Sequence, residues 1–228
     1  MKRATVSFDT KHFEKKKNTG LELSTEETFI EIFQSNHWAG NESISGRGSS
    51  RQQTDEISRQ IPLVVRALKV RRFLDLPCGD FNWLSKIDLE IDLYIGGDII
   101  SDIIEKNNQN HKRKNRKFLK IDLIKDRLPE ADLLHCRDCF VHFSNEDIQS
   151  AIENIKRSGI KYLLTTTFSD CERNPDIVTG DWRIINLEKE PFNFPKPMKL
   201  INEKCTEGGG TYSDKCLGLW EISKHLSE

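Results

Sequence analysis

Short apolar runs recur along the chain and alternate with segments that are compatible with helices. Five of them lie at residues 73–76, 93–97, 118–121, 131–136 and 162–167. Strands that alternate with helices form a parallel sheet with helices on both faces. The clearest intervening helix is predicted from an N-cap at Ser144 to Lys156, with Gly159 as its terminator. The pattern therefore predicts an α/β fold.

The pattern changes after Thr167. A long loop rich in Asn, Pro and Trp precedes two last apolar runs, at residues 198–201 and 217–222. These two runs are typical of a closing antiparallel hairpin. Together with the five earlier runs they give seven predicted strands.

The first 69 residues are interpreted as an arm and helices that extend one domain, not as a separate domain. Residues 1–20 are polar and predict a frayed arm. Ser24 followed by Glu27 is a capping-box pattern that opens a helix. A loop at residues 41–50 leads to a second helix, which begins near Thr54. Pro62 is compatible with a kink in this second helix or with its division into two. The helix is predicted from apolar residues at helical spacing, which are Ile57, Ile61, Val64, Val65 and Leu68.

Composition and charge narrow the class of protein. The chain has 228 residues, of which 36% are hydrophobic, with 35 basic side chains against 36 acidic ones. This length suits one α/β domain, and the net charge of -1 gives no overall attraction to nucleic acid or anionic membrane. No apolar stretch fits a membrane span or a secretory signal, so we expect a cytoplasmic protein.

The six cysteines are expected to be reduced thiols, because no secretory signal accompanies them. Cys136 and Cys139 form an isolated CxxC, whereas a structural zinc site needs two further ligands at matching spacing. We therefore expect no metal.

Polar residues stand where three of the predicted strands end. Gly79 follows the first strand, and a glycine there lets a ligand approach the backbone. Asp98 ends the second strand, nineteen positions later, where a carboxylate can accept hydrogen bonds from both hydroxyls of a ribose. Asp122 follows the third strand and could accept a hydrogen bond from an adenine amino group. The end of the first strand also presents an acidic residue, Asp75. Each Asp could instead be a turn former or helix cap, but three at successive strand ends favour a nucleoside cofactor.

The motifs at these strand ends resemble those of a known family. The segments DLPCGD, YIGGDI and KIDL, followed by LPEADLLHCRD, are similar to the successive motifs of class I S-adenosylmethionine-dependent methyltransferases, over roughly residues 70–222. The segments SISGRGSS, LPCGDFNWL, GDWRIINL and PFNFPKP resemble more closely a methyltransferase-domain family of bacteria and phages. The resemblance implies a Rossmann-like three-layer αβα sandwich with a mostly parallel seven-stranded sheet.

The resemblance also implies a site for S-adenosylmethionine in a domain at residues 70–228. Asp75 and Gly79 would line the methionine portion of the cofactor, Asp98 would hold the ribose, and Asp122 would flank the adenine. Pro77 departs from the family's pattern, because it stands at the place of the first glycine and lacks a backbone N–H. The residues implied for cofactor binding are Asp75, Pro77, Gly79, Asp98, Ile99, Asp122, Leu123 and Arg137.

Methyl transfer needs an aligned acceptor and, where the acceptor is a hydroxyl or amine, a base that removes its proton. His142 is the first candidate base because imidazole titrates near neutral pH, and Asp138 is its rival. His142 could instead satisfy a backbone group, and Asp138 could form an internal ion pair with Arg137.

A second cluster precedes the predicted hairpin and is a candidate acceptor site. Trp182, Arg183 and Asn186 could stack on and hydrogen-bond a sugar or a planar acceptor, with Asn174 and Asp181 nearby. A loop that Trp182 anchors is the alternative.

Two further segments have a functional and an ordinary interpretation. Residues 43–50 are a candidate lid over the cofactor, or else a mobile loop. The basic run at residues 111–117 is interpreted as a solvated loop or helix end, in preference to a phosphate-binding surface.

The sequence therefore favours a methyltransferase that acts on an oxygen or nitrogen of a small molecule or saccharide. Methylation of a protein or nucleic acid, and cofactor binding without catalysis, stay open as alternatives. An NAD-dependent oxidoreductase is disfavoured because the chain lacks the GxGxxG that cradles a pyrophosphate. No membrane partner is expected, nucleic acid is disfavoured, and the oligomeric state is not indicated.

Overall fold

The computed structural model describes residues 9–222 and contains a seven-stranded sheet in the order β3-β2-β1-β4-β5-β7-β6. The first five strands pair in parallel, whereas β7 pairs antiparallel with both β5 and β6. The predicted α/β fold with its C-terminal hairpin is confirmed, and each strand begins and ends within two residues of its prediction. The strands are β1 (Arg72–Asp75), β2 (Leu93–Asp98), β3 (Arg116–Lys120), β4 (Leu133–Cys136), β5 (Tyr162–Phe168), β6 (Lys199–Asn202) and β7 (Lys215–Glu221).

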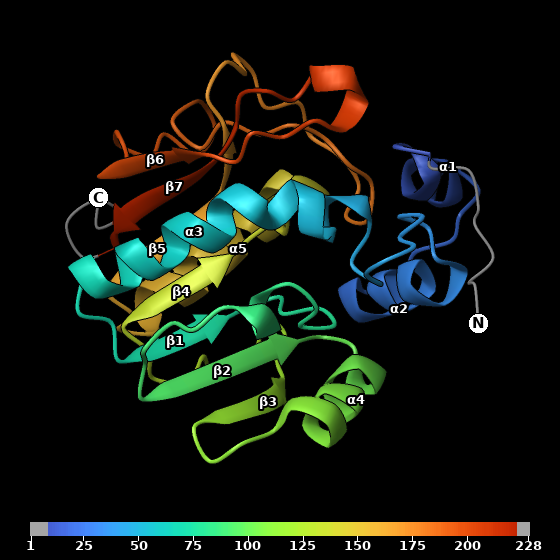
Figure 1. The fold of residues 1–228 in the computed structure, drawn as a ribbon. Helices are drawn as coiled ribbons and strands as arrows, with labels where there is room; N and C mark the ends of the chain where they lie inside the picture. Colours follow the sequence, from blue (N-terminus) through green and yellow to red (C-terminus); the bar gives the residue numbers. More distant parts are fainter. Residues whose placement is uncertain (1–8, 223–228) are drawn as a thin grey trace.

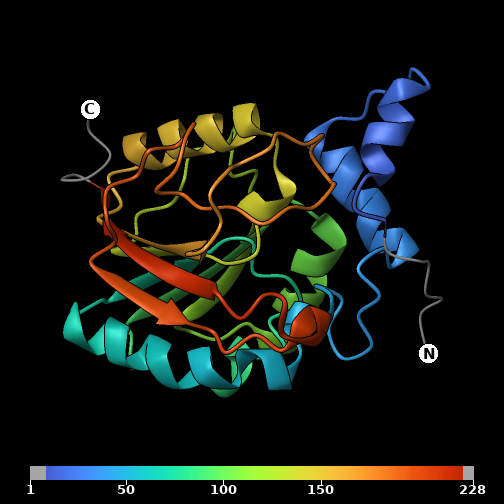
Figure 2. The ribbon, with the colours of Figure 1, turned by 90° about the horizontal axis from the view of Figure 1, so that it is seen from above.

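Helices cover both faces of the sheet, as Figure 2 shows for α3 on one side and α5 on the other. On one face α3 (Arg51–Ala67) and α4 (Ser101–His111) bury apolar residues such as Ile61 and Ile104 against β1, β2 and β3. On the other face α5 (Asn145–Arg157) and the loop before β6 bury residues such as Ile148 and Leu187. The three layers place the carboxyl ends of β1, β2 and β4 at one edge of the core.

The helix boundaries follow local signals in the sequence. The Ser24–Glu27 capping box is present and opens α2 (Thr25–Ser35), and the Ser144 side chain accepts the N–H of Asp147 at the start of α5. Helix α3 continues through Pro62, so the proline does not divide it. Only a short 3-10 turn, Leu84–Lys86, lies between β1 and β2, in a connection that buries Phe81, Leu84 and Leu89 without a full helix.

The prediction of a frayed arm at residues 1–20 is wrong where the structure describes it, and residues 1–8 lie outside the described range. Residues 12–18 form α1 (His12–Asn18), whose Phe13 is only 3% exposed. The carboxylate of Asp181 accepts the N–H groups of Phe13 and Glu14. One buried ring and one capping carboxylate thus hold a helix whose composition is otherwise charged.

Helices α1 and α2 lie beyond the arrowheads of the parallel strands, at the same end of the sheet (Figure 1). This is the edge where open parallel sheets bind ligands. The N-terminal segment is therefore placed to complete a site at the strand ends. Between residues 9 and 222, no helix is both long and apolar enough to span a bilayer.

Candidate functional site

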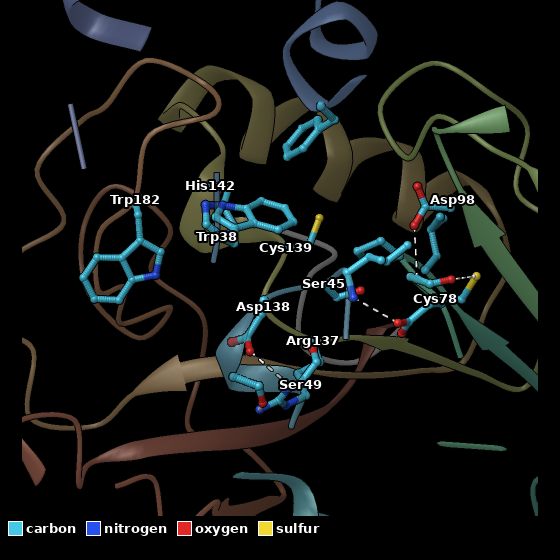
Figure 3. A pocket seen from close by; sticks show the side chains of 18 of the residues that line it. Trp38, Ser45, Ser49, Cys78, Asp98, Arg137, Asp138, Cys139, His142 and Trp182 are labelled. Atoms are coloured by element: carbon cyan, nitrogen blue, oxygen red, sulfur yellow. Dashed lines mark hydrogen bonds and ion pairs between the residues drawn. The ribbon is translucent and has the colours of Figure 1, made fainter. Parts of the chain in front are cut away.

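A cavity of about 760 Å³ lies at the carboxyl ends of β1, β2 and β4. Its volume is within the range of pockets that enclose a small molecule. Strand-end residues form one part of its wall, and residues 38, 39 and 44–49 of the N-terminal segment form another (Figure 3). The sequence-predicted residues that line it are Asp75, Pro77, Gly79, Asp98, Ile99, Asp122, Leu123, Arg137, Asp138, His142 and Trp182.

Gly79 and Asp98 join the turn after β1 to the end of β2. The Gly79 N–H donates to Asp98 Oδ2 over 3.1 Å, and the Ile100 N–H donates to Oδ1 over 3.1 Å. Gly79 has a φ of +51°, and a Cβ built on it would lie 2.0 Å from Ser45 Oγ. Both the backbone conformation and the close approach of Ser45 therefore require glycine at this position.

Burial makes the carboxyl group of Asp98 a weaker acid than usual. The residue is 5% exposed, and this burial raises its pKa from 3.8 to about 6, although the two backbone donors oppose the change. Each carboxylate oxygen has two lone pairs, so the group retains capacity for further donors after these hydrogen bonds. Asp98 is thus a buried acceptor at the cavity wall.

Asp75 ends β1 and belongs to a buried chain of hydrogen bonds. Its Oδ2 accepts the hydroxyl of Tyr94 over 2.5 Å, and its Oδ1 lies 2.7 Å from Nδ1 of His135. His135 lines the cavity, is 1% exposed, and its Nε2 has no hydrogen-bond partner within residues 9–222. No role of His135 was predicted from the sequence, although it is the register partner of Asp75 across β1 and β4, at the strand ends where ligands bind.

Four other cofactor candidates line the cavity: Pro77 follows β1, Ile99 follows β2, and Asp122 and Leu123 follow β3. Asp122 Oδ1 accepts the N–H of Ile124 over 2.8 Å, so this carboxylate caps its own turn while it lines the cavity. Leu123 is 5% exposed and Ile99 is half-buried. Pro77, which lacks an N–H, contributes apolar surface to the wall.

Four charged side chains form a cluster at the cavity wall, in which Arg137, Glu203 and Lys215 are buried and Asp138 is partly exposed. Arg137 Nη2 donates to Glu203 Oε2 over 2.7 Å, and Arg137 Nη1 lies 3.1 Å from Asp138 Oδ2. Lys215 Nζ lies 2.8 Å from Asp138 Oδ2 and 3.7 Å from Glu203 Oε2. Burial opposes ionisation of Asp138, but Arg137 and Lys215 outweigh it and hold the pKa of this carboxyl well below its usual range. Asp138 is therefore a weak proton acceptor, and the sequence analysis missed Glu203 and Lys215.

His142 lies in the cavity wall with a fixed tautomer. Its Nδ1 is 3.0 Å from the carbonyl oxygen of Asp181, and since a carbonyl only accepts, Nδ1 carries the hydrogen. In the neutral ring Nε2 then has the lone pair. Burial lowers the pKa of His142 to about 4, so the imidazole is neutral at pH 7.

Trp38 packs against this imidazole, with ring centroids 4.6 Å apart (Figure 3). It sits between Asn36 and Ala39, which have positive φ values of 51° and 52°, an uncommon conformation for alanine. The indole Nε1 of Trp38 is buried and finds no acceptor among the described residues. The indole therefore contributes its aromatic face, rather than its N–H, to the surroundings of His142.

The candidate acceptor cluster is only partly at the cavity. Trp182 lines it and packs edge-to-face on Tyr212, with ring centroids 5.2 Å apart. The predictions for Arg183 and Asn186 need correction, because neither lines the cavity. Arg183 donates to the carbonyls of Pro175 and Phe140 and to the Asn145 side chain.

The side chain of Asn186 is also used within its loop. Its amide donates to the carbonyls of Ser169 and Cys171, and its backbone N–H donates to Asn174. The polar groups of Asn174 and Asn186 thus hold the long connection between β5 and β6 together. Their side chains are occupied by backbone groups rather than turned toward a ligand.

The loop at residues 43–50, which is rich in Gly and Ser, packs over the turn after β1. Ser43 Oγ donates to Asp80 Oδ1 over 2.9 Å, and the Ile44 N–H donates to Asp80 Oδ2 over 3.0 Å. This places residues 44–49 in the cavity wall. None of the basic run at residues 111–117 lines the cavity, and Lys112, Arg113 and Lys114 are exposed.

The cysteines offer no separate site. All six are buried free thiols. Within the described part of the chain, no group of three or more His, Cys, Asp or Glu side chains could hold a metal ion.

Comparison with known proteins identifies the fold. No protein-family model and no curated protein sequence matches the chain. Among solved structures, PigF with S-adenosylhomocysteine aligns over 93% of this chain and 66% of its own, with a TM-score of 0.61 and 14% identity. Magnesium protoporphyrin IX methyltransferase from Synechocystis PCC 6803, with bound S-adenosylmethionine, aligns over 87% of this chain and 97% of its own, with a TM-score of 0.56 and 14% identity.

Human N-acetylserotonin methyltransferase, in complex with S-adenosylmethionine, aligns over 87% of this chain and 56% of its own, with a TM-score of 0.57 and 13% identity. The chain therefore spans less than two thirds of the length of this protein and of PigF. It has the fold of class I S-adenosylmethionine-dependent methyltransferases, in agreement with the resemblance of its strand-end motifs.

Proposed function

We propose that the chain binds S-adenosylmethionine and transfers its methyl group to an oxygen or nitrogen of a small molecule or saccharide. The observation that carries the proposal is the buried carboxylate of Asp98, held at the end of β2 by the Gly79 N–H in the wall of a 760 Å³ cavity. Ribose hydroxyls are donors that such a carboxylate can accept. The fold of the chain supports the same cofactor.

The rest of the wall also fits an S-adenosyl group. Ile99 and Leu123 supply apolar surface near β3 for an adenine ring, and Asp122 can accept from its amino group. NAD fits less well, because the turn after β1 contains Pro77 where a pyrophosphate needs backbone N–H donors. The order of strands, with an antiparallel β7 between β5 and β6, also departs from the usual dinucleotide-binding sheet.

The cofactor supplies a methyl carbon on a positively charged sulfur, which a nucleophile displaces in line. The chain's own residues hold the acceptor, exclude water and remove its proton. His142 is the proposed base, because the Asp181 carbonyl holds its Nδ1–H and its neutral ring leaves a lone pair on Nε2. Burial lowers its pKa to about 4, which makes it a weaker base than a free imidazole, but Arg137 and Lys215 hold the pKa of Asp138 lower still. The role of Asp138 in the proposal is to fix the cavity floor.

The acceptor is proposed to lie on the aromatic side of the cavity. Trp38 and Trp182 line it together with Tyr212, and aromatic faces bind planar rings and sugar C–H groups. The ring of Trp38 also packs on His142, so an acceptor held there would lie beside the proposed base. The positions of Arg183 and Asn186 do not support a direct contact with the acceptor.

Calorimetric titration with S-adenosylmethionine, S-adenosylhomocysteine and NAD in parallel tests the cofactor. We expect the first two to bind and NAD not to bind. Binding of NAD alone, or of none of the three, overturns the proposal. Release of S-adenosylhomocysteine in a screen of small-molecule acceptors then separates an enzyme from a protein that only binds the cofactor.

A further inference from the structure

We propose that the methyl acceptor carries a positively charged amino group, and that Glu207 binds this group at the cavity wall. The inference rests on the proposed function and adds to it a chemical class of acceptor and a specificity-determining residue. It is carried by a carboxylate that lines the cavity beside two aromatic rings, and that forms no ion pair within residues 9–222.

The position of Glu207 is set by the connection between the last two strands. The residue begins the short 3-10 turn Glu207–Gly210, which lies between β6 and β7. The Thr206 N–H donates to Gln53 Oε1 over 3.1 Å, and Gln53 Nε2 donates to Thr206 Oγ1 over 2.7 Å. The backbone next to Glu207 is therefore tied to α3, while the Glu207 side chain lines the cavity.

The charges around Glu207 leave its carboxylate uncompensated. A Cβ built on Gly48 would lie 3.1 Å from Glu207 Oε2 and 3.3 Å from Asp138 Oδ2, so Glu207 adjoins the charged cluster at the cavity wall. In that cluster the two cations already pair with two carboxylates. Glu207 adds a further negative charge, and its closest donor in the described part of the chain is the Cys205 thiol, 4.0 Å from Oε2.

Partial burial strengthens the attraction of this carboxylate for a cation. Glu207 is partly buried, and desolvation raises its pKa above the ordinary value, although Lys215 opposes the change. A charge that has lost part of its hydration gains more from an opposite charge than one in full contact with water. Arg47 also lines the cavity, but it is exposed, so water and salt screen its attraction for an anion.

Two aromatic rings adjoin the same carboxylate. A Cβ built on Gly208 would lie 2.9 Å from Cε2 of Tyr212, so the turn that carries Glu207 packs against this ring. Tyr212 packs edge-to-face on Trp182, and both rings line the cavity. An ammonium group donates to a carboxylate and is attracted by aromatic faces. The combination therefore suits a ligand with a protonated amine attached to a ring.

The cofactor brings a second positive charge, on its sulfur, which has to be distinguished from the charge of the acceptor. S-adenosylmethionine has this charge, and S-adenosylhomocysteine lacks it. If Glu207 compensated the sulfonium, Glu207→Gln would weaken S-adenosylmethionine and spare S-adenosylhomocysteine. We expect the variant to bind both molecules as the wild type does.

Calorimetry on the complex with S-adenosylhomocysteine compares three probes that share one phenol ring. Tyramine has an amine that is protonated at pH 7, 4-ethylphenol is neutral in its side chain, and 3-(4-hydroxyphenyl)propionate is anionic. We expect tyramine to bind about tenfold or more tightly than the other two, the usual effect of a hydrogen bond to a charged group, and Glu207→Gln to remove this preference. Glu105→Gln, at an exposed position of α4 outside the cavity, is the control and should keep it.

Four outcomes overturn the inference: equal binding of tyramine and 4-ethylphenol, tighter binding of the anion, no binding of any probe, or a preference that survives in Glu207→Gln. A selective loss of S-adenosylmethionine in Glu207→Gln overturns it as well, because the carboxylate would then serve the cofactor. Failure of the wild type to bind S-adenosylhomocysteine would instead remove the proposed function. The order of the three probes in the wild type requires no variant, so it decides even where Glu207→Gln does not fold.

Discussion

Arg137 and Glu203 lie 66 positions apart in the sequence and form an ion pair with an Nη2–Oε2 distance of 2.7 Å. Their side chains are 5% and 1% exposed, so water does not screen the pair. Arg137 directly follows β4, and Glu203 directly follows β6. The pair therefore connects the parallel part of the sheet to the C-terminal hairpin, under the floor of the cavity.

Removal of one partner from this cluster should destabilise the fold. Glu203→Ala leaves Asp138 as the one carboxylate within ion-pair distance of Arg137 and Lys215 between residues 9 and 222, and an uncompensated buried charge costs about 3 kcal/mol or more. Urea unfolding followed by circular dichroism measures the change. Glu153→Ala is the control, because its carboxylate is 59% exposed and pairs with Lys156 at the surface, where the loss should be below about 1 kcal/mol. Similar losses in the two variants would contradict this account.

Asp98→Asn should weaken S-adenosylhomocysteine by about tenfold or more. The amide keeps the size of the side chain, but it replaces an acceptor by a donor and removes the charge that strengthens hydrogen bonds from ribose hydroxyls. Calorimetry measures the dissociation constant. Asp102→Asn, at an exposed position in the first turn of α4, should leave the affinity unchanged. An unaltered affinity in Asp98→Asn would remove the ribose assignment.

The same carboxyl group should make binding depend on pH. Its pKa is about 6 in the folded protein, and hydroxyl donors favour the ionised form. The affinity for S-adenosylhomocysteine should therefore fall as the pH decreases through about 6, and this transition should be absent in Asp98→Asn. A pH-independent affinity of the wild type between pH 5 and 8 would contradict the prediction that ionised Asp98 binds the cofactor.

Stability of the unliganded protein should change in the opposite sense. Folding raises the pKa of Asp98 from 3.8 to about 6. The contribution of this carboxyl group to the free energy of unfolding is therefore fully present below pH 3.8 and is lost as the pH rises through about 6. The melting temperature of Asp98→Asn should accordingly rise, relative to that of the wild type, between pH 4 and 7. A constant difference across this range would show that the carboxyl group is not desolvated.

His142→Ala should keep the affinity for S-adenosylhomocysteine and lower the rate of methyl transfer by roughly a hundredfold or more, the usual contribution of a general base. The rate is measured as S-adenosylhomocysteine released with an acceptor that the wild type methylates. Because the pKa of His142 is about 4, its titration should not reduce the wild-type rate between pH 6 and 8. Full activity of the variant would exclude His142 as the base.

Gly79→Ala tests how closely residues 44–49 approach the turn after β1. The new Cβ would meet Ser45 Oγ at 2.0 Å, in addition to the strain of a positive φ. Gly159→Ala measures that strain alone, because Gly159 has a φ of +74° with no atom within 4 Å of the added Cβ. Gly79→Ala should destabilise the protein by more than this control, which should lose about 1 kcal/mol. The difference should shrink in a Ser45→Gly background, and a difference that persists there would assign the cost to other atoms.

The strands and the residues at their ends were predictable because they follow from regular patterns. Apolar runs located all seven strands, and the rule that ligands bind at strand ends located Gly79, Asp98 and Asp122. His135 would have been found by the same rule, had register been considered together with sequence position. The packing of its ring against Phe73 and Trp83, by contrast, depends on contacts in space that the sequence does not show.

Arg183 and Asn186 show where composition misleads. An arginine and an asparagine in a loop have donors for a ligand, but the sequence does not reveal whether backbone carbonyls already accept them. Phe13 shows the converse, because one apolar residue within a lysine-rich segment was enough to dock a helix. Such outcomes depend on contacts between positions far apart in the chain, which local periodicity does not contain.

Asp181 serves two neighbours through two different groups. Its carboxylate receives the first N–H groups of α1, and its carbonyl receives the ring hydrogen of His142. A substitution that displaces α1 would therefore also disturb the residue that orients the proposed base, although α1 itself does not line the cavity. The docking of the N-terminal helix and the orientation of an imidazole in the cavity wall are in this way linked through a single residue.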